Sequence, residues 1–181
     1  MRDDLIIRRE TPADASTGGP TELLHDAAFG VPEGRAESHE RELLRRLRAD
    51  GDVLDELTFV AELEGEVVGH VVCSRARLGE APSVGLGPLA VRPDHQRQGI
   101  GAALMMAVVA SADRAWEPVI VLLGDPEYYG FFGFVPASRL GIESPGPWED
   151  QYFQALSLRS WTADRGGPFR YAPAFDPLLA G

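Results

Sequence analysis

Lysine and asparagine are absent from this sequence of 181 residues, and all 17 basic residues are arginines. Without lysine there is no phosphate loop of the Walker type, which places a lysine on the terminal phosphates of a nucleotide. Enzymes that form a Schiff base through a lysine amine, pyridoxal enzymes among them, are excluded for the same reason.

Cysteine and long apolar runs are also scarce. Cys73 is the single cysteine of the sequence, so it cannot form a disulfide within the chain. No apolar run has the length of about 18 residues that a membrane helix needs. The charged N-terminal stretch lacks the apolar core of a signal peptide. We therefore expect a cytoplasmic protein with no membrane partner.

The charge balance is acidic, with a formal net charge of -11. Nucleic acid is excluded as a general partner, because binding to its phosphates rests on clustered lysine and arginine. An acidic field attracts cations over a long range, which is a weak indication of a cationic partner. With 44% hydrophobic and 25% charged residues, the chain has the composition of a globular protein, and we expect one domain over residues 1–181.

The hydrophobic pattern predicts that strands and helices alternate along the chain. Strands are expected over residues 5–10, 57–63, 66–78, 83–92 and 119–123, with late strands near 152–158 and 169–171. Helices are expected over residues 21–29, 35–48 and 99–115, and again from Pro126. The pair Glu64-Gly65 is typical of a tight hairpin turn between two of these strands.

The stretch from Gly87 to Ala102 carries the clearest chemical signal. A strand leads through a glycine-containing loop directly into a long helix, whose first N–H groups and dipole favour a phosphate or pyrophosphate. Gly99 and Gly101 allow close approach of the backbone. A dinucleotide-binding loop would need a small residue three positions after the second glycine, and Leu104 stands there. The dinucleotide alternative therefore fails.

The same loop resembles the pyrophosphate loop of the GCN5-related N-acetyltransferase (GNAT) superfamily. The motif Q/R-x-x-G-x-G/A of that family is met by Gln96, Gly99 and Gly101. The resemblance implies an α/β (α+β) fold, with a mixed, mostly antiparallel sheet, helices on both faces and a splayed parallel strand pair. It also implies acetyl-coenzyme A as co-substrate and no metal. A bulge is expected at Pro88, because proline inside a strand is typical of bulges and edges.

The resemblance further assigns two groups of cofactor-binding residues. The strand before the loop would hold the acyl carbonyl and the pantetheine arm, and the loop itself would hold the pyrophosphate. A fixed amide donor aimed at the thioester oxygen would stabilise the negative charge that develops there during attack. The residues that match these positions are Leu89, Ala90, Val91, Gln96, Arg97, Gln98, Gly99, Ile100, Gly101 and Ala102.

A second signature lies after the next strand. Family members commonly carry Tyr-x-x-x-Gly-Phe there, and Tyr129 stands in that register with Gly133 and Phe134. By resemblance, the Tyr129 hydroxyl would protonate the departing coenzyme A thiolate, a general-acid role. Tyr128 lies about 100° further around a helix and should face elsewhere. A packed core aromatic is the alternative interpretation of Tyr129.

The sequence does not mark the base that removes the proton of the amine. Five residues are candidates, either directly or through a water: Glu62, His70, Glu80, Asp94 and His95. Cys73 would suit a ping-pong enzyme with an acyl-cysteine, but a cysteine between strand-forming residues is typical of a core position.

We expect direct transfer in a ternary complex from acetyl-coenzyme A to an amine of a small molecule. The cofactor half would cover residues 57–136, and the acceptor side would be built from residues 1–56 and 137–181. Around the acceptor, the segment with Trp148, Glu149, Asp150 and Tyr152 is a candidate. A protein or peptide N-acetyltransferase and a non-catalytic acyl-coenzyme A sensor stay open as alternatives. The identity of the amine and the oligomeric state, with a homodimer as one option, also stay open.

Overall fold

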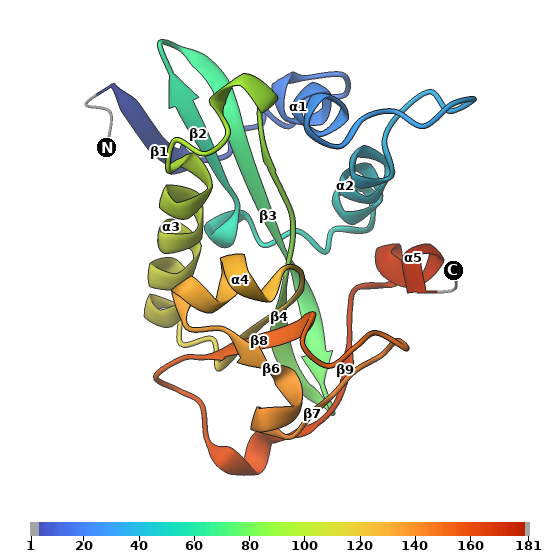
Figure 1. The fold of residues 1–181 in the computed structure, drawn as a ribbon, viewed down its shortest axis with the longest axis vertical. Helices are drawn as coiled ribbons and strands as arrows, with labels where there is room; N and C mark the ends of the chain where they lie inside the picture. Colours follow the sequence, from blue (N-terminus) through green and yellow to red (C-terminus); the bar gives the residue numbers. More distant parts are fainter. Residues whose placement is uncertain (1–3, 180–181) are drawn as a thin grey trace. The chain divides into compact units, whose positions relative to one another are not determined.

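The computed structural model describes residues 4–179, which fold as two compact units. Unit 1 runs to Cys73 and resumes over Pro88–Val108, while unit 2 comprises Ser74–Gly87 and the described residues from Val109 onward. The elements are labelled in Figure 1. Among residues 4–179, none of the helices combines the length and the apolar character that a membrane span requires.

Unit 1 contains the first half of a mixed sheet. Its strands follow the order β1 (Leu5–Arg9), β2 (Phe59–Leu63), β3 (Glu66–Leu78) and β4 (Ala81–Val91), the last two continuing into unit 2. β1 pairs with β2, and β2 with β3, both antiparallel. Glu64 and Gly65, at the turn between β2 and β3, have φ angles of 52° and 84°. Positive φ at both central residues is characteristic of a type I′ turn, as the predicted hairpin requires.

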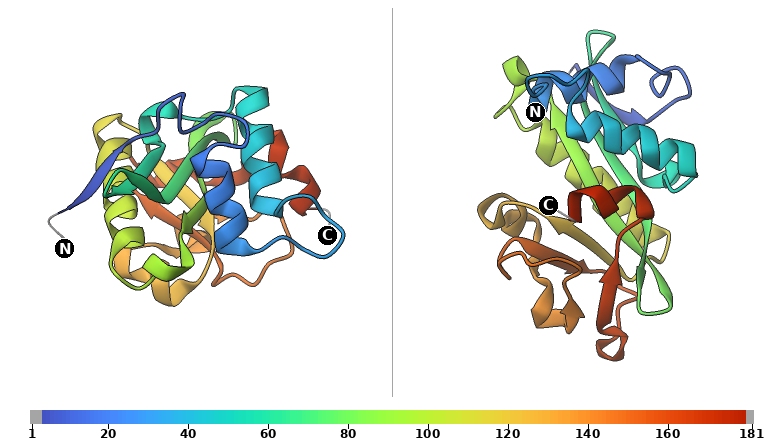
Figure 2. Two further views of the ribbon diagram at one scale, coloured as in Figure 1. Left: turned by 90° about the horizontal axis from the view of Figure 1, so that it is seen from above. Right: turned by 90° about the vertical axis from the view of Figure 1, so that its right-hand side faces the viewer.

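Helices cover both faces of β3 in unit 1. A Cβ added at Gly69 would lie 2.9 Å from Cγ2 of Ile100 and 3.0 Å from Cδ1 of Leu104, so α3 (Ile100–Arg114) packs directly on this glycine. The next residue, His70, points to the opposite face, where it meets His25 of α1 (Pro20–Phe29). α1 and α2 (His39–Asp50) pack together, and Figure 2 shows them side by side.

The start of α2 differs from the prediction. The sequence favours a helix from residue 35, whereas α2 begins at His39. Ser38 has extended backbone angles, and its side chain accepts a hydrogen bond from the Arg41 N–H at 3.1 Å. Ser38 is therefore the N-cap residue, and α2 begins directly after it. At the other end, Gly51 takes a left-handed conformation and caps the helix.

Unit 2 contains the second half of the sheet. β5 (Val119–Leu123) lies between β4 and β8 (Phe153–Ser157), and β8 also pairs with β6 (Val135–Pro136). β9 (Gly167–Arg170) is antiparallel to β3 and parallel to β7 (Ile142–Glu143). The short strands β6 and β7 were not predicted, because two residues carry no readable pattern.

The β4–β5 pair is parallel, as predicted. Among residues 4–179 its ladder consists of Val84 with Ile120 and Gly85 with Val121, although β4 continues to Val91. Gly87 has a φ of 139°, a conformation that residues with a side chain rarely adopt. β4 is therefore irregular immediately before Pro88, where the sequence predicts a bulge.

The core of unit 2 is apolar and centred on β5. Val119 and Val121 are fully buried and pack with residues of β3, β7, β8 and β9. The short helix α4 (Pro126–Tyr129) follows β5, with the Asp125 side chain accepting from the Glu127 N–H at its start. α5 (Asp176–Leu179) ends the described chain.

The apolar stripe predicted on α3 is buried. Ile100, Leu104, Val108 and Ala112 have exposed fractions of 2% or less. Their four-residue spacing places them on one side of the helix, which is why the pattern was readable from sequence.

Candidate active site

The loop between β4 and α3, in unit 1, has the backbone shape of an anion-binding site. Arg97 and Gly99 both have positive φ, at 59° and 85°. Such conformations turn successive N–H groups toward one concave side, and they are uncommon for a residue like Arg97. The first backbone hydrogen bond of α3 runs from the Ala103 N–H to the Gly99 carbonyl. The N–H groups of the residues just before Ala103 therefore make no hydrogen bond within the helix.

Side chains within the loop fix its conformation. The Gln96 amide donates to the Val91 carbonyl at 3.1 Å, which ties the loop back to the end of β4. The Gln98 amide donates to the Asp94 carbonyl at 3.1 Å. Arg97 and Gly99 are exposed, and a Cβ added at Gly99 would meet no atom within 4 Å. The loop therefore combines a fixed backbone with open space beside it.

A cluster of charged residues braces the start of this loop. Arg92 pairs with Asp94 at 2.8 Å and with Glu66, at the tip of the β2–β3 hairpin, at 2.9 Å. His95 Nδ1 lies 2.8 Å from the Asp94 carboxylate. The pKa of Asp94 is lowered by its hydrogen bonds to His95 and Arg92. These contacts occupy Asp94 and His95, two of the candidate bases, in holding the loop.

The strand segment Leu89–Val91 leads into this loop. Ala90 and Val91 are buried, and Leu89 is half-buried. Pro88, at the start of the segment, has no N–H to give to a neighbouring strand. The geometry of β4 thus changes at Gly87 and Pro88, one residue before the segment that the family resemblance assigns to the acyl group.

Tyr129 lies in unit 2, at the end of α4. Its ring packs against the backbone of Gly124, where an added Cβ would lie 2.2 Å from Cε2 of Tyr129. The ring also meets Phe134 edge-on, with the centroids 5.9 Å apart. Burial, together with the nearby Tyr128 and Asp125, raises the pKa of Tyr129 to about 12. The Tyr129 hydroxyl is thus protonated at neutral pH. The side chain of Tyr128 is more exposed than that of Tyr129.

The remaining candidate bases already have partners. Glu62 accepts from Arg8 at 2.8 Å. Glu80 is 90% exposed and lies 3.3 Å from Arg77. His70 is fully buried and contacts His25 and Glu10. Of the candidates, His70 is therefore the one placed in a buried polar network.

Cys73 is also fully buried, within unit 1. Its N–H donates to the Thr58 hydroxyl at 3.4 Å, and its carbonyl accepts from Leu54. A side chain with no exposure does not suit the ping-pong alternative, which needs an accessible thiolate.

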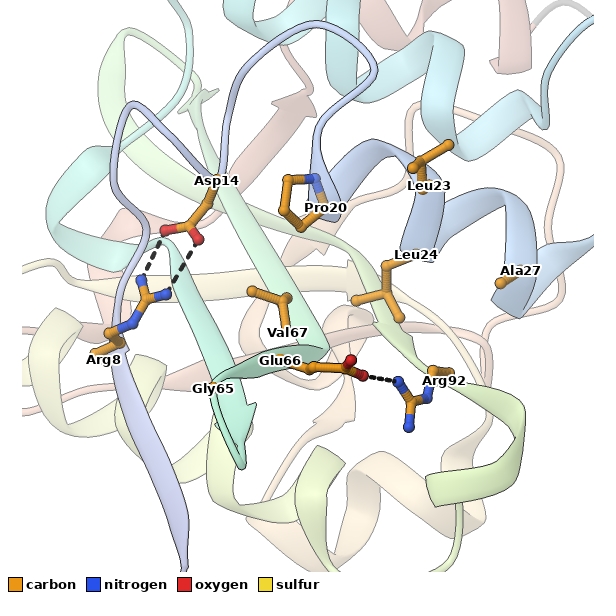
Figure 3. Close-up of a pocket in the computed structure, with 10 residues that line it drawn as sticks. All are labelled: Arg8, Asp14, Pro20, Leu23, Leu24, Ala27, Gly65, Glu66, Val67 and Arg92. Atoms are coloured by element: carbon orange, nitrogen blue, oxygen red, sulfur yellow. Dashed lines mark hydrogen bonds and ion pairs between the residues drawn. The ribbon is translucent and has the colours of Figure 1, made fainter.

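Unit 1 contains a cavity of about 510 Å³ between α1 and the tip of the β2–β3 hairpin. Figure 3 shows its two ion pairs, Arg8 with Asp14 and Arg92 with Glu66, with the apolar side chain of Val67 drawn between them. Both arginines are thus already neutralised by carboxylates.

Unit 2 contains a second cavity, of about 470 Å³. Trp148 and two acidic residues, Glu143 and Asp150, are among the residues that line it. The Trp148 ring stacks on Phe153 with centroids 6.0 Å apart. An aromatic ring beside carboxylates is a suitable environment for a cation. Trp148 and Asp150 belong to the segment that the sequence assigned to the acceptor side, whereas Glu149 and Tyr152 are not part of this lining.

Comparison with known proteins identifies the family. Residues 21–122 match the model of the Acetyltransferase (GNAT) family. The Escherichia coli K12 protein named Uncharacterized N-acetyltransferase YjhQ is 31% identical, over 83% of this chain and 82% of its own length. The chain belongs to the GNAT acetyltransferase family. The resemblance seen in the loop sequence is confirmed.

Solved structures of GNAT proteins agree with this fold. A crystal structure of the GNAT-family N-acetyltransferase YhbS from Escherichia coli, in complex with CoA, has a TM-score of 0.84 and 27% identity and covers 96% of this chain and 92% of that one. A GNAT acetyltransferase from Brucella melitensis, in complex with acetyl-CoA, has a TM-score of 0.74 and 33% identity and covers 95% of this chain and 98% of that one. The predicted mixed, mostly antiparallel GNAT fold is confirmed.

Two contacts, one in each unit, were not found from the sequence. The first is Gly124, whose missing side chain makes room for the Tyr129 ring. The second is His25, which contacts His70 although the two are 45 positions apart. A glycine after a strand and a histidine in a helix carry no distinctive local signal.

Proposed function

We propose that this chain is an N-acetyltransferase that transfers the acetyl group of acetyl-coenzyme A directly to an amine of a small molecule within a ternary complex. The observation that carries the proposal is the loop from Gln96 to Ala102. Its positive φ angles at Arg97 and Gly99, and the N–H groups ahead of the α3 ladder, fit a pyrophosphate. The CoA complexes of YhbS and of the Brucella protein support the same ligand class.

The reaction needs an acid and a set of amide donors. Acetyl-coenzyme A supplies an activated thioester, whose carbonyl carbon accepts the amine lone pair while the carbon–sulfur bond breaks. N–H groups of Leu89–Val91 would stabilise the charge on the carbonyl oxygen. Tyr129 would give its proton to the sulfur, and its raised pKa keeps that proton available at neutral pH.

A cavity in unit 2 supports the proposal that the acceptor is a small cation. Trp148, Glu143 and Asp150 are among the residues that line a cavity of about 470 Å³, a size that suits a small molecule. The net charge of -11 also attracts cations toward the protein. We propose that the cationic end of the acceptor binds at Trp148. A screen of polyamines, aminoglycosides, amino acids and peptides for acetyl-coenzyme A consumption would identify the acceptor class, and turnover of peptides alone would favour the protein N-acetyltransferase alternative.

The cofactor site is tested by replacing Gly99 and Gly101 with valine. A side chain at Gly99 strains its backbone at φ 85° and narrows the concave loop. We expect calorimetry to detect no acetyl-coenzyme A binding by this double variant. Gly34→Val is a matched control, because Gly34 lies in the same unit, has a φ of 81° and likewise has open space around it. Wild-type affinity in a folded double variant would contradict the site.

The acid is tested by Tyr129→Phe, which keeps the ring and removes the proton donor. We expect kcat to fall about 10²- to 10⁴-fold, with little change in the KM for acetyl-coenzyme A. Tyr128→Phe is the control, and it should stay near wild type. If chemistry limits the rate and the two variants are equally active, Tyr129 is not the acid, and a solvent-derived proton or the sensor interpretation replaces it.

A further inference from the structure

The acidic residues of the two cavities differ in their partners. In the unit 1 cavity, both acidic residues pair with arginines, at 2.6 and 2.9 Å. In the unit 2 cavity, the carboxylates of Glu143 and Asp150 form no ion pair or hydrogen bond with another residue among 4–179. The unit 1 cavity is therefore neutralised from within the protein, whereas the unit 2 cavity retains negative charge that a ligand can neutralise.

The lining of the unit 2 cavity carries charge of one sign. Apart from Glu143 and Asp150, its residues are neutral: Ser138, Gly141, Ile142, Ser144, Trp148 and Phe153. None of the described residues that line it is basic. A cationic group therefore meets opposite charge in this cavity, whereas a carboxylate or a phosphate meets repulsion and no positive partner.

The walls of this cavity are fixed by local structure. Glu143 lies in β7, which pairs with β9. The Trp148 ring stacks on Phe153, and it also lies close to Gly146, where an added Cβ would be 3.0 Å from Cζ2 of the ring. The Ser144 hydroxyl donates to the Gly146 carbonyl at 2.8 Å, which ties together the turn before Trp148. A site with fixed walls loses little conformational freedom when a ligand binds.

The proposed binding mode requires two nitrogens in the acceptor. If its cationic end lies in this cavity, that end cannot also receive the acetyl group, so a second nitrogen must attack the thioester. The bond from this nitrogen to the acetyl carbon forms while the carbon–sulfur bond breaks. The products are the monoacetylated amine, coenzyme A and the one proton that the attacking nitrogen gave up.

We propose that the acceptor is a diamine or polyamine with no carboxylate or phosphate at the end that binds in the unit 2 cavity. This inference rests on the proposed function. The ammonium group at that end lies beside Trp148 and is neutralised by Glu143 and Asp150, while an amine at the other end receives the acetyl group. The cavity rejects the α-ammonium end of an amino acid, because a carboxylate is attached to the same carbon.

Three ligands with carbon chains of equal length test the proposal on the wild-type protein. Pentylamine has one amine, cadaverine has a second at the other end, and norleucine is pentylamine with a carboxylate on the carbon that bears the amine. In calorimetry we expect pentylamine and cadaverine to bind. Norleucine should bind at least about 10-fold more weakly, the factor expected for repulsion between like charges a few ångströms apart.

Turnover separates the two nitrogens. In an assay of released coenzyme A thiol, we expect acetylation of at least one of putrescine, cadaverine and spermidine, which differ in the distance between their amines. Pentylamine should inhibit that reaction by competition and should not be acetylated, because its single nitrogen lies in the cavity.

Two conservative variants test the acidic residues. Glu143→Gln and Asp150→Asn each remove one negative charge and keep the size of the side chain. We expect each to weaken cadaverine binding about 5- to 10-fold and to narrow the gap between pentylamine and norleucine. Asp164→Asn is the matched control, because Asp164 is an exposed acid of unit 2 outside the cavity lining. It should keep the wild-type affinity for cadaverine.

The binding and transfer assays fail separately. Norleucine that binds as tightly as pentylamine would overturn the proposal, as would pentylamine acetylated as fast as the diamines. Wild-type cadaverine affinity in both folded charge variants would also overturn it. A protein that binds these amines with the expected selectivity and yet consumes no acetyl-coenzyme A would instead refute the proposed function, because calorimetry does not depend on acetyl transfer.

Discussion

The position of the Tyr129 ring depends on the absence of a side chain at Gly124, and Gly124→Ala tests this dependence. An added Cβ would lie 2.2 Å from Cε2 and 2.7 Å from Cδ2 of Tyr129. Carbon atoms in contact are normally about 3.5–4.0 Å apart, so the ring has to recede by about 1.3 Å. The φ angle of Gly124 is not in the positive range, so alanine adds no backbone strain and the effect is confined to the ring.

We expect this displacement to affect turnover more than cofactor binding. A misplacement of about 1 Å in a catalytic group costs about 10²-fold in rate, which corresponds to about 2.7 kcal/mol of barrier. The crowding itself should lower the free energy of unfolding by about 1–3 kcal/mol. The assay measures released coenzyme A thiol for kcat, calorimetry for acetyl-coenzyme A affinity, and urea denaturation for stability.

Two further variants make the result interpretable. Gly130→Ala adds the same methyl group in the same segment, where the backbone is helical and no atom lies within 4 Å, so it should keep wild-type activity. In the double variant Gly124→Ala with Tyr129→Phe, the two losses should not add, because both act on the same hydroxyl. A folded Gly124→Ala variant with wild-type kcat would refute the reasoning.

Three other predictions concern the stability of unit 1. Gly69→Ala would place a Cβ 2.9 Å from Ile100, and we expect a loss of about 1–3 kcal/mol in urea denaturation; unchanged stability would mean that α3 does not pack tightly on β3. Ser38→Ala removes the N-cap of α2 and should cost about 1 kcal/mol, whereas Ser38→Asp should restore most of the loss, and equal stability of all three proteins would contradict the cap. Burial lowers the pKa of His25 and His70, so below about pH 6.5 the unfolded chain binds more protons than the folded one. Stability should therefore fall as the pH drops from 6.5, and a urea midpoint that is constant between about pH 7 and 5 would contradict the buried neutral pair.

The local features of this protein were determined by short stretches of sequence. The hairpin turn depends on two adjacent residues, Glu64 and Gly65. The buried stripe of α3 depends on apolar residues spaced four positions apart. The loop motif of Gln96, Gly99 and Gly101 is equally local, and it was sufficient to predict the GNAT family. Such features are readable because backbone conformation and helix periodicity act over a few residues.

The start of α2 was decided by competition between two local signals, helix propensity and the N-cap. The charged residues after Arg35 favour a helix in isolation, yet Ser38 caps the N–H of Arg41 and starts α2 at His39.

The two-residue strands β6 and β7 form only because they pair with their neighbours β8 and β9. Neither could be predicted, because a strand this short is stabilised by its partner and not by its own sequence.

The tertiary structure alone decided which polar side chains meet. Glu10 directly follows β1, whereas His70 lies in β3 and His25 in α1, and nothing in the sequence of any one segment predicts the other two. The same holds for Trp148 and Glu143, which line one cavity in unit 2. Contacts of this kind depend on how the strands pair and which face each residue takes. A shift of one residue in a strand would turn His70 to the side of α3, and the network would be lost.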